Sequence, residues 1–259
     1  MDLFSALLER LRRMVQSVQE FTLFSVEVAR ATFTRPFYAR ETLHQLHFAG
    51  IGSLLIVVVS SIVAGQALAL QLARELATSG AKSQLGHFMV VSVVRALGPV
   101  LTGMVVASRM SAGITAEIGA MRSSDQIDAL VAFGSDPIKR LVVPRLIALV
   151  VALPALTILG DSLAVIGGGL VGLQYHVTWD TYMNGVLKYL TPKNLLVGMI
   201  KPFLFGIMIV IVACWKGFSS EGGAKGVGVS TTQSVVISSV GILVVDGICT
   251  RLIFRLLHW

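Results

Sequence analysis

The chain has 259 residues, of which 54% are hydrophobic and only 14% are charged, with a mean hydropathy of +0.80. Soluble domains carry about 25% charged residues, so this composition excludes an ordinary soluble protein and indicates a multi-pass membrane protein. The net charge of +7 is compatible with a nucleic-acid partner. The basic residues, however, gather at the ends of apolar segments, as they do beside membrane spans, and we expect no binding of nucleic acid.

Residues 1–35 have the pattern of an amphipathic helix. Leu7, Leu11 and Val18 fall on one helical face, whereas Arg13 lies on the opposite one. A basic amphipathic helix ahead of the first span is typical of an interfacial helix that lies in the plane of the membrane. We therefore expect residues 1–35 to lie on the cytoplasmic surface, with packing on a soluble partner as the alternative.

Five apolar segments follow, and each has the roughly 20 residues that a helix needs to cross a bilayer. They predict an all-α polytopic membrane protein with five transmembrane helices. The predicted spans are 48–72, 88–107, 141–173, 195–215 and 235–254. More of the lysines and arginines flank the spans on the N-terminal side of the membrane, so the positive-inside rule favours a cytoplasmic N-terminus. The longest loop on the side of the membrane opposite the N-terminus, residues 174–194, is expected to contain a short amphipathic helix.

A polar stretch, residues 104–130, joins the second and third spans. It mixes charged side chains such as Arg109 and Arg122 with many small residues, so it belongs outside the hydrocarbon or in a contact lined by protein. The spacing of Ile114 and Ile118 with the apolar residues that follow is close to helical. We interpret the stretch as a short amphipathic helix at the membrane face, with a solvated connecting loop as the alternative.

The same stretch resembles a known family. Residues 116–121 (AEIGAM) and 125–130 (DQIDAL) are similar to the signature of the MlaE (YrbE) permease family, and residues 94–100 (VRALGPV) resemble its Arg-Glu-Leu-Gly-Pro motif. Members are the membrane subunits of ABC-type lipid transporters that work with MCE-domain proteins. The resemblance extends from about residue 48 to residue 259.

This resemblance implies a permease transmembrane domain over residues 48–259, with a cytoplasmic coupling helix at about 113–130. It also implies a homodimer in the bacterial inner membrane, cytoplasmic ABC ATPase subunits, a periplasmic MCE-domain partner and a phospholipid substrate. The residues expected to couple to the ATPase are Glu117, Gly119, Met121, Asp125 and Gln126. The sequence has no nucleotide-binding or catalytic motif. We therefore expect a non-enzymatic subunit that binds no cofactor or metal itself, with ATP used by a partner.

Two positions depart from the family pattern. Ala96 stands where the family has a glutamate after the arginine, so Arg95 lacks a counter-ion next to it in the sequence. Asp125-Gln126 replaces a Glu-Gln dipeptide, which keeps the charge but shortens the reach of the side chain.

Four ionisable residues fall inside the predicted spans: Arg95, Asp161, Lys201 and Asp246. Each costs roughly 2.5–3.5 kcal/mol on insertion scales, so each needs a partner or a wet cavity. Arg95 and Lys201 in one cavity would suit an anionic headgroup. Neutralisation of each cation by Asp161 or Asp246 is one alternative, and snorkelling of Lys201 to the interface is another.

The predicted lipid site lies at the dimer interface and has apolar walls around these two cations. Its residues are Arg95, Lys201, Leu68, Leu72 and Leu76. Apolar walls with a few cations suit a lipid better than a sugar or an amino acid. The alternative function is a proton-coupled secondary transporter with Asp161 and Asp246 as relay carboxylates, and a purely structural membrane subunit is a third reading.

Overall fold

The computed structural model describes the backbone of residues 2–256 and the side chains of residues 12, 15–253 and 255. Helices make up almost all of this part, and it contains no strand. The α-helices are α1 (Asp2–Thr32), α2 (Ala39–Thr78), α3 (Leu85–Ser92), α4 (Gly98–Ser123), α5 (Gln126–Ala132), α6 (Val143–Gln174), α7 (Trp179–Tyr189), α8 (Pro192–Phe218) and α9 (Gly223–Leu256). The short segments are the 3₁₀ turn η1 (Lys82–Gln84) and the π-helical turns η2 (Val93–Leu97) and η3 (Ile138–Val142).

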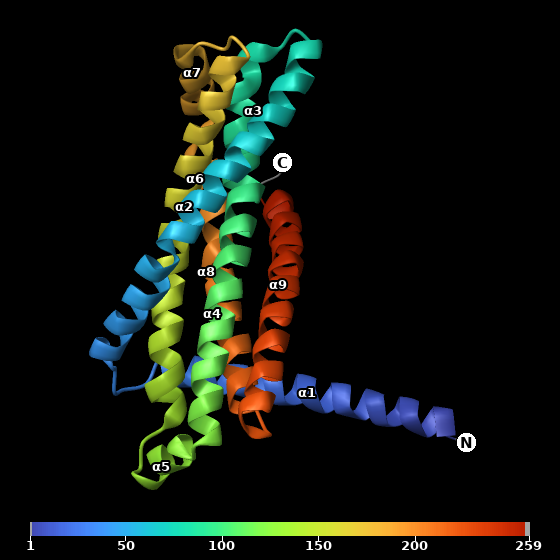
Figure 1. Ribbon diagram of the computed structural model, residues 1–259, viewed down its shortest axis with the longest axis vertical. Helices are drawn as coiled ribbons and strands as arrows, with labels where there is room; N and C mark the ends of the chain where they lie inside the picture. Colours follow the sequence, from blue (N-terminus) through green and yellow to red (C-terminus); the bar gives the residue numbers. More distant parts are fainter. Residues whose placement is uncertain (1, 257–259) are drawn as a thin grey trace.

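Five helical segments of the described chain are long and apolar enough to cross a membrane, which confirms the all-α fold and the number of predicted spans. They are Ala39–Thr78, Lys82–Ser123, Ile138–Gln174, Pro192–Phe218 and Gly223–Ile253. Figure 1 shows them side by side as one elongated bundle. Most exceed the predicted bounds, because the helices continue through polar residues that hydropathy alone assigns to loops.

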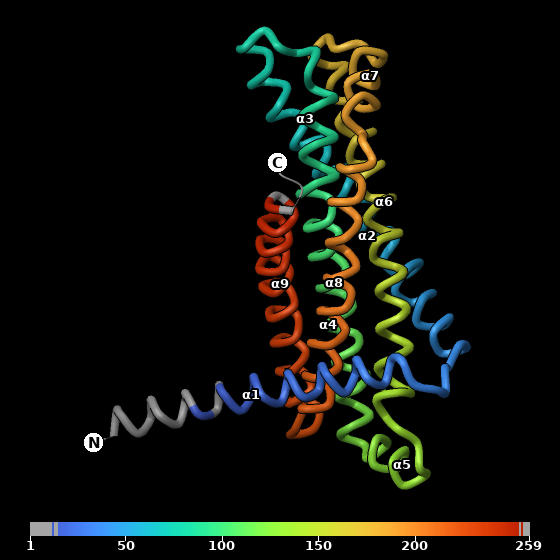
Figure 2. The backbone as a smooth tube through the Cα atoms, turned by 180° about the vertical axis from the view of Figure 1, so that it is seen from behind, coloured from blue at the N-terminus to red at the C-terminus, as the bar shows by residue number. Residues whose placement is uncertain are grey.

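The helix α1 lies across the bundle rather than along it (Figures 1 and 2). Its last turns bury Val28 and Ala31 in the bundle core. Phe21 packs edge-on against Trp215, with the ring centroids 5.4 Å apart. The predicted helix within residues 1–35 is therefore observed, while its position in the membrane interface stays a prediction.

The helices α2 and α6 pack side by side because their facing surfaces are small. The Cβ of any larger residue at Gly65 would collide with the backbone oxygen of Ala164, so glycine permits a close approach of the two backbones. On the other side of the bundle, α4 packs against both α8 and α9. Two apolar cores result, one in the half nearer α1 and one between α3, α6 and α7.

The loop between the third and fourth spans contains the expected short helix, α7. Thr178 caps it by accepting a hydrogen bond from the backbone N–H of Thr181. Its buried side chain Tyr182 donates a 2.7 Å hydrogen bond to the backbone oxygen of Val165 on α6. Burial raises the pKa of Tyr182 above its usual value, so the phenol keeps the proton that this hydrogen bond requires.

The central stretch differs from the expected form. We expected one in-plane helix over about residues 113–130, but α4 runs unbroken to Ser123 and buries Ile114 and Ile118 inside the bundle. The hydroxyls of Ser123 and Ser124 both donate to the carbonyl of Ala120 and so compete with further helical turns. Asp125 then takes a left-handed conformation, with φ of 57°, and α5 begins as a separate short helix.

Candidate functional site

The π-helical turn η2 in the second span exposes a backbone carbonyl to the bundle interior. Gly98 donates its backbone N–H to Val93, five residues earlier, which defines the π turn η2. Pro99 follows and has no N–H, so the carbonyl of Arg95 loses its α-helical donor. A single π turn inside an α-helix is a frequent mark of a functional site, and here it leaves a backbone oxygen available in the bundle interior.

Lys201 supplies the missing donor from α8. Its Nζ lies 2.7 Å from the carbonyl oxygen of Arg95 and 2.7 Å from the Oδ1 atom of Asp246 on α9. The side chain of Lys201 is only 1% exposed, so its charge is neutralised inside the bundle and it does not snorkel. One ammonium group thus ties the second, fourth and fifth spans together.

Arg95 makes a second link to α8 through its side chain. Its Nε and Nη2 atoms donate to Oδ1 of Asn194 over 2.9 and 2.5 Å. Asn194 and Lys201 are seven residues apart and therefore share a face of α8. Between them, a Cβ at Gly198 would collide with the carbonyl of Val94, so glycine brings α8 close enough to η2 for both contacts.

Asn194 is the functional residue that the sequence reasoning missed. The available signal was the helix start Thr191-Pro192-Lys193-Asn194, in which the Thr191 hydroxyl accepts from the backbone N–H of Asn194. Its side-chain amide also donates to the carbonyl of Tyr189 over 2.6 Å. An amide whose oxygen and nitrogen are both engaged is a fixed partner for the guanidinium.

The structure brings two of the five expected lipid-site residues together and places the other three elsewhere. Arg95 and Lys201 meet at η2, as described above. Leu68, Leu72 and Leu76 follow one face of α2 and pack, partly buried, against the core between α3, α6 and α7. Contact of all five with a lipid stays a prediction.

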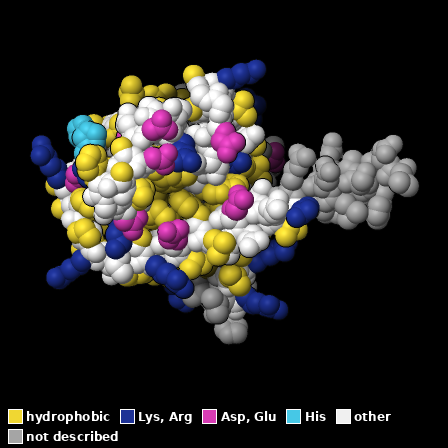
Figure 3. Space-filling view, turned by 90° about the horizontal axis from the view of Figure 1, so that it is seen from below, with side chains coloured by type: hydrophobic (Ala, Val, Ile, Leu, Met, Phe, Trp, Pro, Cys, Tyr) yellow, Lys and Arg dark blue, Asp and Glu magenta, His cyan; other side chains and the backbone are white. Residues whose placement is uncertain are grey.

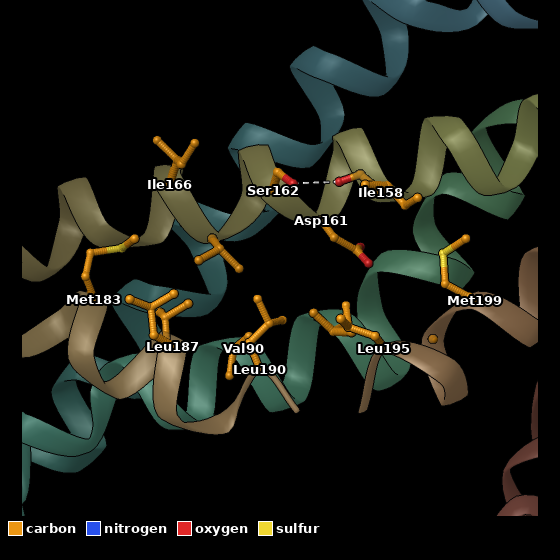
Figure 4. A pocket seen from close by; sticks show the side chains of 14 residues that line it. Val90, Ile158, Asp161, Ser162, Ile166, Met183, Leu187, Leu190, Leu195 and Met199 are labelled. Atoms are coloured by element: carbon orange, nitrogen blue, oxygen red, sulfur yellow. Dashed lines mark hydrogen bonds between the residues drawn. The ribbon is translucent and has the colours of Figure 1, made fainter. Parts of the chain in front are cut away.

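A separate cavity of about 380 Å³ opens between α3, α6, α7 and α8. Figure 4 shows its walls, which are almost entirely apolar, with the carboxyl of Asp161 directed into the space. None of the five expected lipid-site residues lines it. The cavity borders η2 at Val94 and α8 at Gly198, but Lys201 pairs with Asp246, so of the two carboxyls considered as partners for the cations only that of Asp246 is seen paired with Lys201.

The five expected coupling residues lie at the α5 end of the bundle, with different exposures. Glu117, Asp125 and Gln126 are exposed, and Met121 is half-buried. Gly119 is buried, and a Cβ there would meet Ser220 and Val227, so glycine permits close packing at this position. The coupling role of all five residues stays a prediction.

Glu117 is held by the third span. Its Oε2 atom pairs with Nη2 of Arg145 at 2.7 Å, and Arg145 is 4% exposed. Arg145 also donates to the carbonyl of Leu141. Nearby, Arg122 and Asp128 form an exposed pair at 2.8 Å that links α4 to α5. Figure 3 shows acidic side chains around an apolar hollow on this face.

Five spanning helices with charged groups buried between them define a multi-pass membrane protein. The family model described as Permease MlaE matches residues 42–252. The chain therefore belongs to the MlaE permease family, as its motifs indicated.

Two relatives that match nearly the whole chain are named as permease proteins. The chain is 39% identical to a "Probable ABC transporter permease protein" of Rickettsia bellii, over 95% of this chain and 96% of the relative. It is 31% identical to the "Intermembrane phospholipid transport system permease protein MlaE" of Haemophilus influenzae, over 90% of each. It is also 36% identical to "Protein TRIGALACTOSYLDIACYLGLYCEROL 1, chloroplastic" of Arabidopsis thaliana, over 83% of this chain and 62% of that protein. These findings make the chain a permease subunit of an ABC transporter.

Proposed function

We propose that this permease moves phospholipids between the bacterial inner membrane and an MCE-domain partner, for lipid homeostasis of the outer membrane, with energy from separate cytoplasmic ATPase subunits. The observation that carries the proposal is the match of nearly the whole chain to a phospholipid transport permease. The chain itself forms the lipid pathway and changes conformation in response to the ATPase subunits. Those partners bind and hydrolyse ATP.

We expect the ATPase subunits to contact the α5 end, where Glu117, Asp125 and Gln126 are exposed. Only Ser124 and Asp125 separate α4 from α5 along the chain, and the Arg122–Asp128 pair also links the two helices. A push on α5 is therefore transmitted along α4, which passes directly into η2 and the Arg95–Lys201 contact. We expect this end, and with it the N-terminus, to face the cytoplasm.

A second copy of the chain is expected to cover α9. Apolar side chains of α9 remain exposed along its length, among them Val236, Val240 and Leu243. A membrane-facing surface of this kind accepts either lipid or another helix. In a homodimer joined along α9, the Lys201–Asp246 pair of each copy would lie on the bundle side of α9, next to a lipid cavity between the two copies.

The alternative, a proton-coupled transporter with Asp161 and Asp246 as relay groups, is not favoured by any specific contact. Asp246 is held by Lys201 at 2.7 Å, and Asp161 lies in the separate apolar cavity. A relay would require the two carboxyls to exchange a proton along one path.

The coupling surface is tested by the double variant Asp125→Lys with Gln126→Ala, reconstituted in liposomes with the ATPase and MCE-domain partners. We expect ATP hydrolysis to continue while phospholipid transfer falls at least tenfold. The matched control is Asp180→Lys, because Asp180 is an exposed acidic residue on α7, at the opposite end of the bundle. Transfer at the wild-type rate in the double variant would refute the proposed coupling surface.

A further inference from the structure

The cavity between α3, α6, α7 and α8 has the composition of a site for an apolar chain. Val90, Val165, Met183 and Leu187 are among the residues that form its walls, and their side chains offer no polar atom (Figure 4). Its volume of about 380 Å³ lies within the usual range of small-molecule pockets, about 300–1,000 Å³. Only Asp161 and Ser162 contribute polar side chains to the lining.

Of these two polar groups, only Asp161 is available to a ligand. The hydroxyl of Ser162 donates to the carbonyl of Ile158 in its own helix over 2.8 Å. The side chain of Asp161 is half-buried and lines the cavity. Its Oδ1 atom is buried without a hydrogen-bond partner among the described residues, so a ligand in the cavity would bind the part of the carboxyl that remains accessible. The carboxyl fits only because Gly98 lies beside it, since a Cβ at residue 98 would collide with the Asp161 carboxyl.

Among the described residues, the lining of the cavity has an acidic group but no basic one, since it contains no lysine, arginine or histidine. A carboxylate inside a membrane span is costly unless something compensates its charge. A charge-assisted hydrogen bond from a cation is among the strongest ways to do so. A headgroup that carries only negative charge would meet apolar walls and a like charge in this cavity.

We propose that this cavity binds a lipophilic amine, with its ammonium group donating to Asp161 and its apolar chain lying against Val165, Met183 and Leu187. A metal ion is a poor alternative, because hard cations need several oxygen ligands and this cavity offers a single carboxyl. Neither Arg95 nor Lys201 lines this cavity, although it borders η2 at Val94 and α8 at Gly198, and its occupancy does not depend on the proposed transport function. Two sources share the required chemistry, namely a single-chain amine and the ethanolamine headgroup of a phospholipid.

The test measures binding of radiolabelled dodecylamine to the purified protein in phosphatidylcholine nanodiscs, with empty nanodiscs as background. We expect saturable binding that dodecanoate and dodecanol do not displace. The Asp161→Asn variant, which keeps the shape of the side chain and removes its charge, should weaken binding at least tenfold. The control Asp180→Asn removes an exposed carboxylate outside the cavity and should leave binding unchanged.

A second variant keeps the proposal testable if Asp161→Asn does not fold. Leu187 lines the cavity and points between α7 and α6 (Figure 4), and it is 63% exposed, so Leu187→Trp should fill the space without disturbing the core and should abolish binding. Wild-type affinity in either variant, or displacement by dodecanol as strong as by dodecylamine, would overturn the proposal. Nanodiscs doped with phosphatidylethanolamine separate the two sources. Competition by this lipid identifies a headgroup as the ligand, and its absence identifies a single-chain amine.

Discussion

Replacement of Lys201 by methionine should destabilise the bundle by about 3 kcal/mol. Methionine keeps most of the length of lysine but leaves the Asp246 carboxylate without its counter-ion and the Arg95 carbonyl without its hydrogen-bond donor. Removal of one partner from a buried ion pair costs about 3–5 kcal/mol. The lower end of that range applies because Asp246 is 21% exposed, so part of its charge is accessible to solvent or lipid headgroups.

The double variant Lys201→Met with Asp246→Leu separates the energy of the ion pair from that of the hydrogen bond to the Arg95 carbonyl. The single variant Asp246→Leu strands the Lys201 ammonium, which is 1% exposed, and should cost at least as much as Lys201→Met. When both charges are removed together, neither is left buried alone. Only the Arg95 carbonyl then lacks a donor, at about 1–3 kcal/mol. The double variant should therefore lose about 3 kcal/mol less than the sum of the two single variants.

These free energies can be measured by unfolding the purified protein with sodium dodecyl sulfate in mixed micelles, followed by circular dichroism. A folded wild-type reference and an identical unfolding slope for each variant are the controls. If the two single losses add to the double loss within about 0.5 kcal/mol, the two side chains do not interact. That result would refute the assignment of Lys201 as a neutralised, bridging cation.

Three further changes test contacts elsewhere by the same unfolding assay. Tyr182→Phe removes the donor to Val165 and should cost about 1 kcal/mol, whereas Tyr175→Phe, which affects only an exposed contact with Arg74, should cost less. Gly65→Ala should be clearly destabilising because its Cβ meets the backbone of α6, while Gly50→Ala on the same helix meets nothing and should stabilise by about 0.5–1 kcal/mol. Glu117→Gln should cost more than Arg145→Met, since the first strands a buried guanidinium and the second only an exposed carboxylate; the reverse order would contradict this burial argument.

Apolar length and spacing were sufficient to predict the five spans, α7 and the helical nature of residues 2–32. These features depend on local patterns that any membrane helix must satisfy. The end of α4 could not be predicted in the same way. Ser123, Ser124 and Asp125 break the helix only because their side chains bond locally and tolerate the turn, and the same residue types occur within many unbroken helices.

The partner of each intramembrane charge also depended on tertiary structure. The sequence identified Lys201 and Asp246 as needing compensation, but their pairing requires α8 and α9 to lie side by side. The contact with the Arg95 carbonyl follows from Pro99, which is visible in the sequence, together with the placement of Lys201, which is not. Asn194 escaped prediction because an amide at a helix start usually serves as a cap.

The most direct test of the proposed function is native mass spectrometry of the protein purified from bacterial membranes, with lipid extraction from the same sample. We expect a dimer of this chain that carries two subunits with ATP-binding motifs and releases phospholipid on extraction. A chain that purifies alone, with neither an ATP-binding subunit nor phospholipid, would contradict its role as the permease of an ATP-driven phospholipid transporter.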